Sequence, residues 1–213
     1  MTKRLETILL NLEKCRVFAD VGCDHGYVAK GMLDADKCEK AIVSDVSEKC
    51  LNKAKDLLKE EISQGRAQAI VSNGLEKLPP IDLVLIAGMG GEEIISILSS
   101  AVILPDKLVL QPMKNVDKVR LFLTATGYKI NKDFCFEDGG KFYDLLVIDK
   151  GEQTLTDEQI LLGKTNLEEK SADFLERNRQ EIKRIDKILS TGKIDFETQK
   201  KLQKKQEVLK KYV

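Results

Sequence analysis

Two short segments that contain aspartates after apolar runs are the first candidates for a functional site. Residues 18–27 read Phe-Ala-Asp-Val-Gly-Cys-Asp-His-Gly-Tyr, and residues 42–46 read Ile-Val-Ser-Asp-Val. An apolar strand that enters a glycine-containing turn, followed by a strand that ends in a carboxylate, is typical of the nucleotide-cofactor corner of an open α/β sheet. The pattern predicts a site for an adenosine-containing cofactor. A plain tight turn between a strand and a helix is the alternative explanation of the glycines.

The charge of the turn indicates which cofactor it suits. Asp20 and Asp24 would repel a pyrophosphate, and a cleft of reduced dielectric strengthens this repulsion. S-adenosylmethionine has no phosphate and carries sulfonium and ammonium cations. Asp45, at the end of the second strand, is placed to accept hydrogen bonds from both ribose hydroxyls. We therefore expect S-adenosylmethionine to be bound by Asp20, Gly22, Cys23, Asp24, His25, Gly26, Asp45 and Val46.

Three later turns add polar or glycine residues at strand ends. Asn73 and Gly74 follow the third strand, where an amide can meet the edge of an adenine. Residues 86–91 read Ile-Ala-Gly-Met-Gly-Gly, and such glycines allow a cofactor or a flat base to approach the backbone, unless they only serve a turn with positive φ. We assign Asn73, Gly74, Ala87, Gly88 and Met89 to the cofactor, and Gly90, Gln111 and Pro112 to the substrate.

The elements that position these residues alternate along the chain. Strand-like runs cover residues 16–21, 41–45, 67–72, 82–87 and 107–111, and amphipathic segments that begin at capping residues such as Ser47 and Asn115 separate several of them. Runs at 128–136 and 143–150 are too close for a crossover helix and predict a hairpin. The expected fold is α/β, a Rossmann-like class I methyltransferase sheet of parallel strands with a terminal antiparallel hairpin.

The C-terminal part reads as helical. A capping box at Thr156 and apolar residues at near-heptad spacing predict one long helix to Ser190, and Asp195 begins a second helix after a Thr-Gly break. We expect these helices to form an antiparallel helical coiled coil. The predicted domains are 1–151, which binds S-adenosylmethionine, and 152–213, whose coil either binds substrate or serves as a stabilising or oligomerising appendage.

Composition narrows the class of protein and the compartment. Lys plus Arg and Asp plus Glu both number 35, but residues 177–213 hold 12 basic and 5 acidic side chains, as a polyanion-binding face or a solvated lysine-rich helix would. No apolar run reaches the roughly 20 residues that span a bilayer. Five cysteines without a Cys-x-x-Cys pair indicate free thiols rather than a metal site or disulfides. We expect a cytoplasmic protein with no metal and no membrane partner.

Several motifs together resemble the bacterial tRNA (adenine-N1)-methyltransferases that modify position 22. They are Lys-Arg-Leu at 3–5, the 20–27 turn, the 86–91 segment, Leu-Gln-Pro at 110–112, Arg120, Glu-Asp-Gly-Gly-Lys at 137–141 and Tyr143. The resemblance implies methyl transfer from S-adenosylmethionine to adenine N1 in the D-arm of tRNA, with the C-terminal helices engaging tRNA. It adds Arg4, Tyr27, Arg120, Lys141 and Tyr143 to the substrate-binding residues. We separately expect a monomer or weak dimer.

The reaction needs little acid–base chemistry, because adenine N1 already has an in-plane lone pair. Positioning and electrostatics can supply most of the acceleration. We expect Asp24 to be catalytic by stabilising positive charge on the base, although it could instead hold the methionine moiety or cap a helix. A methyltransferase for another RNA site or a small molecule, with a dimerising coil, is one alternative function. A non-catalytic RNA-binding protein is another.

Overall fold

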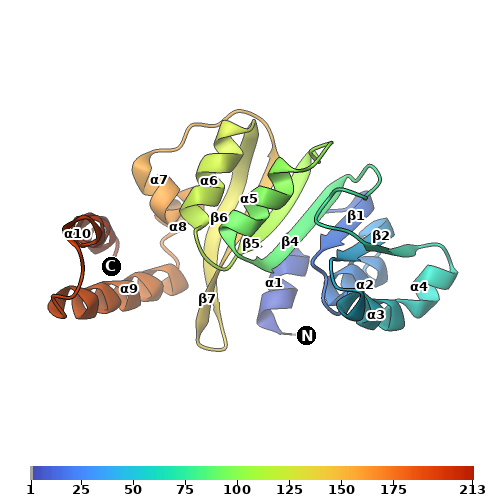
Figure 1. The fold of residues 1–213 in the computed structure, drawn as a ribbon, viewed down its shortest axis with the longest axis horizontal. Coiled ribbons are helices and arrows are strands. Elements are labelled where there is room, and N and C mark those ends of the chain that lie inside the picture. The colour runs from blue at the N-terminus through green and yellow to red at the C-terminus, as the bar shows by residue number, and fades with distance from the viewer. Residues whose placement is uncertain (1) are drawn as a thin grey trace.

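A seven-stranded sheet forms the centre of the computed structural model, which describes residues 2–213 (Figure 1). Its strands are β1 (Cys15–Val21), β2 (Cys38–Asp45), β3 (Ala67–Val71), β4 (Leu83–Met89), β5 (Lys107–Pro112), β6 (Tyr128–Asp138) and β7 (Lys141–Lys150). They lie in the order β3-β2-β1-β4-β5-β7-β6. β7 runs antiparallel to β5 and β6, and the other pairs are parallel. The predicted Rossmann-like methyltransferase sheet with a terminal hairpin is confirmed.

The parallel strands bring their carboxyl ends to one edge of the sheet. Asp20 near the end of β1 lies in register with Val43 of β2 and Leu85 of β4. Along β1, Phe18 packs into the core on one face of the sheet and Ala19 into the core on the other. Strands buried on both faces need the nearly continuous apolar runs that the sequence shows.

Helices cover both faces of the sheet. They are α1 (Lys3–Asn11), α2 (Tyr27–Asp34), α3 (Glu48–Leu57), α4 (Lys59–Ser63), α5 (Gly91–Ser99) and α6 (Val116–Ala125). α1, α2 and α3 bury Ile8, Val28 and Leu51 on one face. α5 and α6 bury Ile94 and Val119 on the other. The two apolar cores hold the sheet between them, so that its strand ends become a rigid support for the site.

The predicted helix start at Ser47 is confirmed, and Thr2 caps α1 in the same way. Each side chain accepts a hydrogen bond from a backbone N–H three residues later. At Asn115 the helix begins as expected, but the residue adopts φ 56° and its side chain makes no capping hydrogen bond. Among residues 2–213, no helix has the length and apolar character that crossing a membrane requires.

The single long helix predicted from Thr156 to Ser190 is wrong. The capping box at Thr156 is present, but the segment folds into α7 (Asp157–Leu162), α8 (Lys164–Glu169) and α9 (Ala172–Ser190). Gly163 with φ +90° and Lys170 with φ +48° separate them. The breaks let α8 cover the open edge of the sheet, where Thr165 and Asn166 accept hydrogen bonds from backbone N–H groups of β6.

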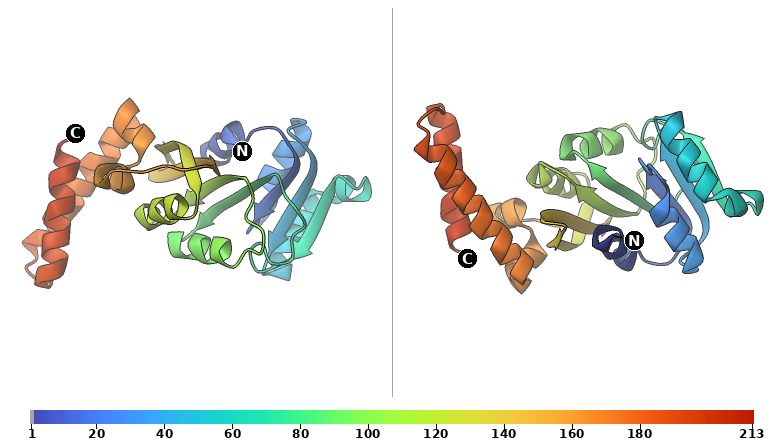
Figure 2. Two further views of the ribbon diagram at one scale, coloured as in Figure 1. Left: turned by 90° about the horizontal axis from the view of Figure 1, so that it is seen from above. Right: turned by 90° about the horizontal axis from the view of Figure 1, so that it is seen from below.

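α9 and α10 (Phe196–Lys210) pack together and run in opposite directions, as expected (Figure 2). Phe174, Ile185 and Leu209 are buried between the C-terminal helices. Asp195 caps α10 by accepting a hydrogen bond from the N–H of Thr198 at 2.9 Å. The pair projects away from the sheet in every view (Figures 1 and 2). α7 packs on α6 and α8 packs on β6, so the segment after residue 151 contacts the sheet domain directly. The division into two domains at residue 151 therefore stays a prediction.

Candidate active site

A cleft of about 450 Å³ opens at the carboxyl ends of β1 and β4. The loop between β1 and α2 forms one wall, and the first turn of α1 forms another. Residues far apart in the sequence meet here, because the N-terminal helix returns to the edge of the sheet. Among the residues expected at the site, the cleft is lined by Arg4, Asp20, Gly22, Cys23, Asp24, His25, Tyr27, Ala87 and Gly88.

The glycine turn is held by backbone contacts with the neighbouring strand. The carbonyl of Ser44 accepts hydrogen bonds from the N–H groups of Gly22 at 2.8 Å and Cys23 at 3.2 Å. Gly22 and Gly26 have φ +72° and +73°, a region that favours glycine. A Cβ on Gly22 would also lie 2.0 Å from Cε of Met89. Because the Met89 methyl ends a flexible side chain that can shift, it is the left-handed backbone conformation that favours glycine at position 22.

Asp20 is a buried carboxylate below the turn, with 5% of its surface exposed. Desolvation raises its pKa from the ordinary 3.8 to about 7, against the lowering effects of a backbone hydrogen bond from Ala29 and the charge of Arg4. A cation bound in the cleft would favour the ionised form of this group. The site therefore fits a cationic ligand better than an anionic one.

Asp24 lies at the mouth of the cleft in a left-handed conformation, with φ 46°. Its carboxylate lies 2.8 Å from Nδ1 of His25 and accepts a hydrogen bond from Nζ of Lys53 at 3.2 Å. Slight desolvation raises the pKa of Asp24, but the contacts with His25 and Lys53 outweigh it and leave the pKa below its ordinary value. The His25 ring stacks on Tyr27, with centroids 5.4 Å apart.

The carboxylate of Asp45 stands at the end of β2, as the sequence predicts. Its Oδ1 accepts a hydrogen bond from the N–H of Ser47 at 2.7 Å, which fixes the orientation of the carboxylate. The carbonyl of Asp45 accepts a hydrogen bond from the N–H of Ser72, which brings the Asn73 turn beside it. Asn73 is exposed, and its amide donates to Oε1 of Glu76 at 2.7 Å. Val46 is 68% exposed next to this pair.

Arg4 is fixed beside the cleft by several contacts. Its Nε–H donates to Oε1 of Gln111 at 2.6 Å, and its guanidinium lies 5.5 Å from the ring centroid of Tyr143. A Cβ on Gly88 would lie 2.9 Å from Arg4 Nη2, so glycine leaves room for the guanidinium. Gln111 is fully buried, and Pro112 is buried as well. Gln111 thus holds the Arg4 guanidinium from the buried end of β5.

Arg120, expected to contact RNA, is instead buried at 1% exposure. It donates to both oxygens of Asp133, at 2.7 and 2.9 Å, and to the carbonyls of Ile160 and Leu161 at the end of α7. Desolvation opposes the charge of Arg120, but Asp133 and nearby Asp144 outweigh it and hold the pKa of the guanidinium above its ordinary value. The burial removes Arg120 from the RNA-contacting residues and gives it the role of joining the C-terminal helices to the sheet.

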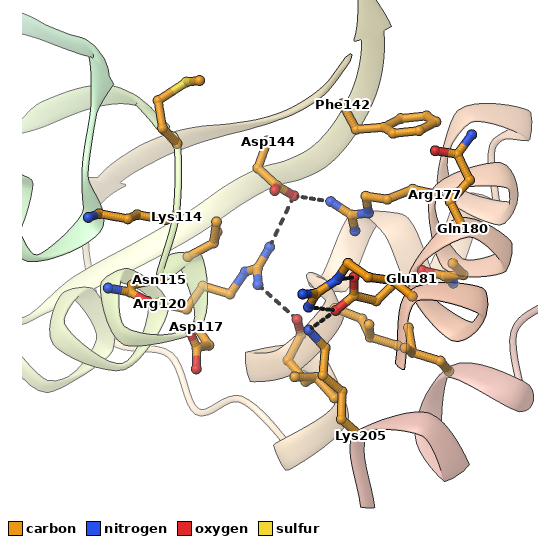
Figure 3. A pocket seen from close by; sticks show the side chains of 17 residues that line it. Lys114, Asn115, Asp117, Arg120, Phe142, Asp144, Arg177, Gln180, Glu181 and Lys205 are labelled. Atoms are coloured by element: carbon orange, nitrogen blue, oxygen red, sulfur yellow. Dashed lines mark hydrogen bonds and ion pairs between the residues drawn. The ribbon is translucent and has the colours of Figure 1, made fainter. Parts of the chain in front are cut away.

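This ion-pair network continues across a second cleft, of about 780 Å³, between the sheet and α9 (Figure 3). Asp144 on β7 accepts a hydrogen bond from Nη1 of Arg177 on α9 at 2.6 Å. Across the cleft wall, Glu181 binds Arg184 and Lys205. Tyr143 and Asp144 are neighbours on β7. One contacts Arg4 beside the first cleft, and the other binds Arg177 of α9.

The other expected residues have different surroundings. Gly90 precedes α5 as its N-cap, and Lys141 is exposed where β7 begins. Burial raises the pKa of the Cys23 thiol, which favours a small residue that fits the turn over a reactive thiolate at this position. Within residues 2–213, no group of three or more His, Cys, Asp or Glu side chains is arranged to hold a metal ion.

Sequence reasoning missed two contacts at the site. Lys53 pairs with Asp24 from α3, and Asp138 accepts a hydrogen bond from the N–H of Arg4 at 2.9 Å. Nothing local marks Lys53, because it is one lysine on an amphipathic helix. The position of Asp138, next to the Gly-Gly turn of the hairpin, is a signal that could have placed it near the strand ends.

Comparison with known proteins identifies the family to which these features belong. The model of the tRNA (adenine(22)-N(1))-methyltransferase family matches residues 18–213. The chain belongs to this family. A Bacillus subtilis tRNA (adenine(22)-N(1))-methyltransferase is 27% identical over 98% of this chain and 92% of its own. A Mycoplasma pneumoniae protein described as a candidate tRNA methyltransferase is 36% identical over 76% of this chain and 79% of its own.

A solved structure agrees over the full chain. The crystal structure of a candidate tRNA (m1A22) methyltransferase of Streptococcus pneumoniae, in complex with S-adenosyl-L-methionine, superposes with a TM-score of 0.90. It is 25% identical and covers 100% of this chain and 99% of that one. As a member of this methyltransferase family, the chain combines the methyltransferase sheet with the paired C-terminal helices.

Proposed function

We propose that this protein transfers a methyl group from S-adenosylmethionine to N1 of adenine 22 in tRNA. The main support, beside family membership, is the buried carboxylate of Asp20 below a glycine turn, in a cleft that opens at the strand ends. When bound, S-adenosylmethionine supplies an electrophilic methyl group on a cationic sulfur. A buried carboxylate stabilises a cation in its cleft and disfavours a pyrophosphate.

The residues around the cleft divide into those for the cofactor and those for the base. Asp20 would hold the ammonium group, and Asp45 would accept hydrogen bonds from the ribose hydroxyls. Asn73 and Gly74 would meet the adenine of the cofactor. The remaining proposed cofactor contacts are Gly22, Cys23, His25, Gly26, Val46, Ala87, Gly88 and Met89.

Asp24 is the proposed catalytic residue. The low pKa of its carboxylate keeps it ionised at neutral pH, so it can stabilise the positive charge that develops on the target adenine. Its exposure at the cleft mouth leaves it accessible to a base that enters from solvent. If Asp24 serves only to hold the methionine moiety, its removal will weaken cofactor binding as much as turnover.

The tRNA partner would meet the site through the residues around Arg4. Arg4, Tyr27, Gly90, Lys141 and Tyr143 are the proposed substrate contacts, with Gln111 and Pro112 supporting Arg4 from below. The basic C-terminal helices would add contacts to the phosphate backbone. We also propose that the protein acts in the cytoplasm as a monomer or weak dimer, in line with its free cysteines.

The direct test uses purified protein, S-adenosylmethionine and unmodified tRNA transcripts. Nucleoside mass spectrometry detects N1-methyladenosine, and reverse-transcription stops map it. We expect a stop at adenine 22, and no stop in a transcript in which guanine replaces that adenine. Methylation of other RNA positions, or of none, would contradict the proposal.

A second candidate is a small-molecule methyltransferase whose coil only dimerises, because paired helices of this kind often serve assembly. Salt separates the two. Binding through phosphates weakens steeply between 50 and 200 mM salt, whereas binding of a small acceptor does not. A flat salt response of tRNA binding would favour the second candidate.

A further inference from the structure

Phe196 is an exposed aromatic residue at the far end of the C-terminal helix pair. The chain has seven phenylalanines, and the other six are buried or half-buried, whereas Phe196 is 74% exposed. It begins α10 next to the loop that joins α9 to α10, at the part of the molecule most distant from the sheet (Figures 1 and 2). A large aromatic ring in this position gains little burial from the fold.

Two lysines share the exposed helix face of the ring, and three more lie in the neighbouring segments of the chain. Phe196, Lys200 and Lys204 follow one another at intervals of four residues, which places them on one exposed face of α10. Residues 187–204, which include the loop, hold five lysines and two acidic residues, a net charge of +3. Within residues 2–213, none of these five lysines forms an ion pair, whereas Lys205 and Lys211, nearer the other end of α10, pair with Glu181 and Glu158.

We infer that this tip, formed by Phe196 and the lysines at 187, 193, 200, 201 and 204, binds an unpaired nucleobase of the tRNA and its flanking phosphates. The inference rests on the proposed function, since it gives that tRNA a second contact. An aromatic ring stacks on any base that has left its own stack, and nearby lysines neutralise the phosphates. A duplex would offer only its backbone to the ring.

Charge argues against a second copy of the chain as the occupant. Two tips brought together would place like charges of +3 against each other, and the ring is too small to offset this repulsion by burial alone. RNA supplies the opposite charge and the flat apolar face at the same place.

The distance between the tip and the candidate active site sets a length that a bound RNA must span. α9 has 19 residues and is therefore about 28 Å long. Its first turn lies near the site, where Asp173 accepts a hydrogen bond from the N–H of Glu137 at 3.0 Å and lies 4.0 Å from Lys3. The tip therefore lies about 28 Å along α9 from the turn that contacts Lys3 and Glu137, so we expect the stacked base to lie outside a short stem-loop around the target adenine.

The chain contains no tryptophan, so Phe196→Trp places the only tryptophan of the variant at the tip, and its emission can be excited selectively over that of the four tyrosines. Titration of this variant with unmodified tRNA at low salt should quench its fluorescence, because stacking on a base brings the ring into contact with it. A minimal stem-loop that contains the target adenine should cause no quenching. Unchanged fluorescence with tRNA, under conditions where anisotropy shows binding, would overturn the inference.

Affinity gives a second readout. Phe196→Ala and Phe196→Leu should each weaken tRNA binding about fivefold or more, and Phe196→Trp should retain it, since base–aromatic stacking has that magnitude. The salt dependence should stay unchanged in these variants and become shallower in Lys200→Gln. Val102→Ala is the matched control, because Val102 is 89% exposed in the loop between α5 and β5.

The outcomes separate the inference from the function on which it rests. Wild-type protein that neither binds nor methylates tRNA refutes the proposed function. Wild-type protein that methylates tRNA, with Phe196→Ala of equal affinity, refutes the tip alone. A dimer seen by sedimentation in wild type and lost in Phe196→Ala would assign the ring to a second copy of the chain and overturn the inference.

Discussion

The Asp20→Asn substitution tests the reasoning about the cofactor cleft, because it removes the buried charge and keeps the shape of the side chain. In the folded protein the pKa of Asp20 is about 7, against 3.8 in a solvated chain. A carboxylate whose folded pKa is raised stabilises the fold below the unfolded pKa, and this contribution is lost as pH rises through the folded pKa. The relevant window therefore runs from about pH 4 to about pH 7.

The magnitude follows from the same two values. Each pH unit within the window changes the free energy of unfolding by roughly 1.4 kcal/mol, so Asp20 contributes roughly 2.5 kcal/mol at pH 5 and close to nothing at pH 8. Urea unfolding of wild type and Asp20→Asn at both pH values measures it. We expect wild type to lose roughly 2.5 kcal/mol relative to the variant between pH 5 and pH 8.

An exposed carboxylate serves as the control for the pH dependence of stability. Asp106→Asn removes an exposed carboxylate and should leave the pH dependence of stability as in wild type. Titration of other groups affects all three proteins alike and cancels in the difference. If the difference between wild type and Asp20→Asn is the same at pH 5 and pH 8, Asp20 is ionised in the fold and the argument from desolvation fails.

The same group should couple cofactor binding to pH. If Asp20 is neutral in the free protein below pH 7 and ionised beside the bound cation, binding releases a proton. We then expect the affinity for S-adenosylmethionine to fall by up to tenfold per pH unit below pH 7, and Asp20→Asn to bind weakly at every pH. Calorimetry in buffers of different ionisation enthalpy counts the proton; equal heats at pH 6 would contradict the coupling.

Three further predictions address other parts of the site. Asp24→Asn should lower kcat by about tenfold or more and leave the Kd for S-adenosylmethionine nearly unchanged, as measured by single-turnover assays and calorimetry, whereas equal losses would make Asp24 a cofactor ligand only. Gly88→Ala should displace Arg4 and lower kcat/KM for tRNA roughly tenfold, while Gly65→Ala, with a similar positive φ and open space around it, should not. Asp133→Asn should lower the free energy of unfolding by roughly 3–5 kcal/mol in urea titrations, because Arg120 would stay buried without its partner, against at most about 1 kcal/mol for Asp106→Asn; equal effects would contradict the buried network.

Most of the fold could be predicted because its signals are local. Apolar runs such as those of β1 and β4 mark strands buried on both faces, and the short spacing before β7 excludes a crossover helix. The caps at Thr2 and Ser47 act within three residues. The prediction of one helix from Thr156 to Ser190 is wrong because the signal that decides it is not local. α8 is held by hydrogen bonds to the open edge of β6, which a heptad pattern does not reveal.

The candidate site divides in the same way. The glycine turn and the carboxylates of Asp20 and Asp45 could be predicted, because each lies at the end of a strand whose direction follows from the alternating pattern. The role of Arg120 could not. In a chain expected to bind RNA, an arginine suggests a phosphate ligand. The structure instead shows Arg120 donating to the buried carboxylate of Asp133 and to the carbonyl of Ile160 in α7.

The sequence alone thus determined the class of fold, the cofactor corner and the family motifs, since periodicity, turn chemistry and spacing are properties of neighbouring residues. The tertiary structure decided what distant residues do to one another. It set the desolvation that raises the pKa of Asp20, joined Arg4 to Gln111 and Tyr143, and left Phe196 exposed at the end of the helix pair. Burial and long-range contacts are made by elements that lie far apart in the sequence, so they exist only once the chain has folded.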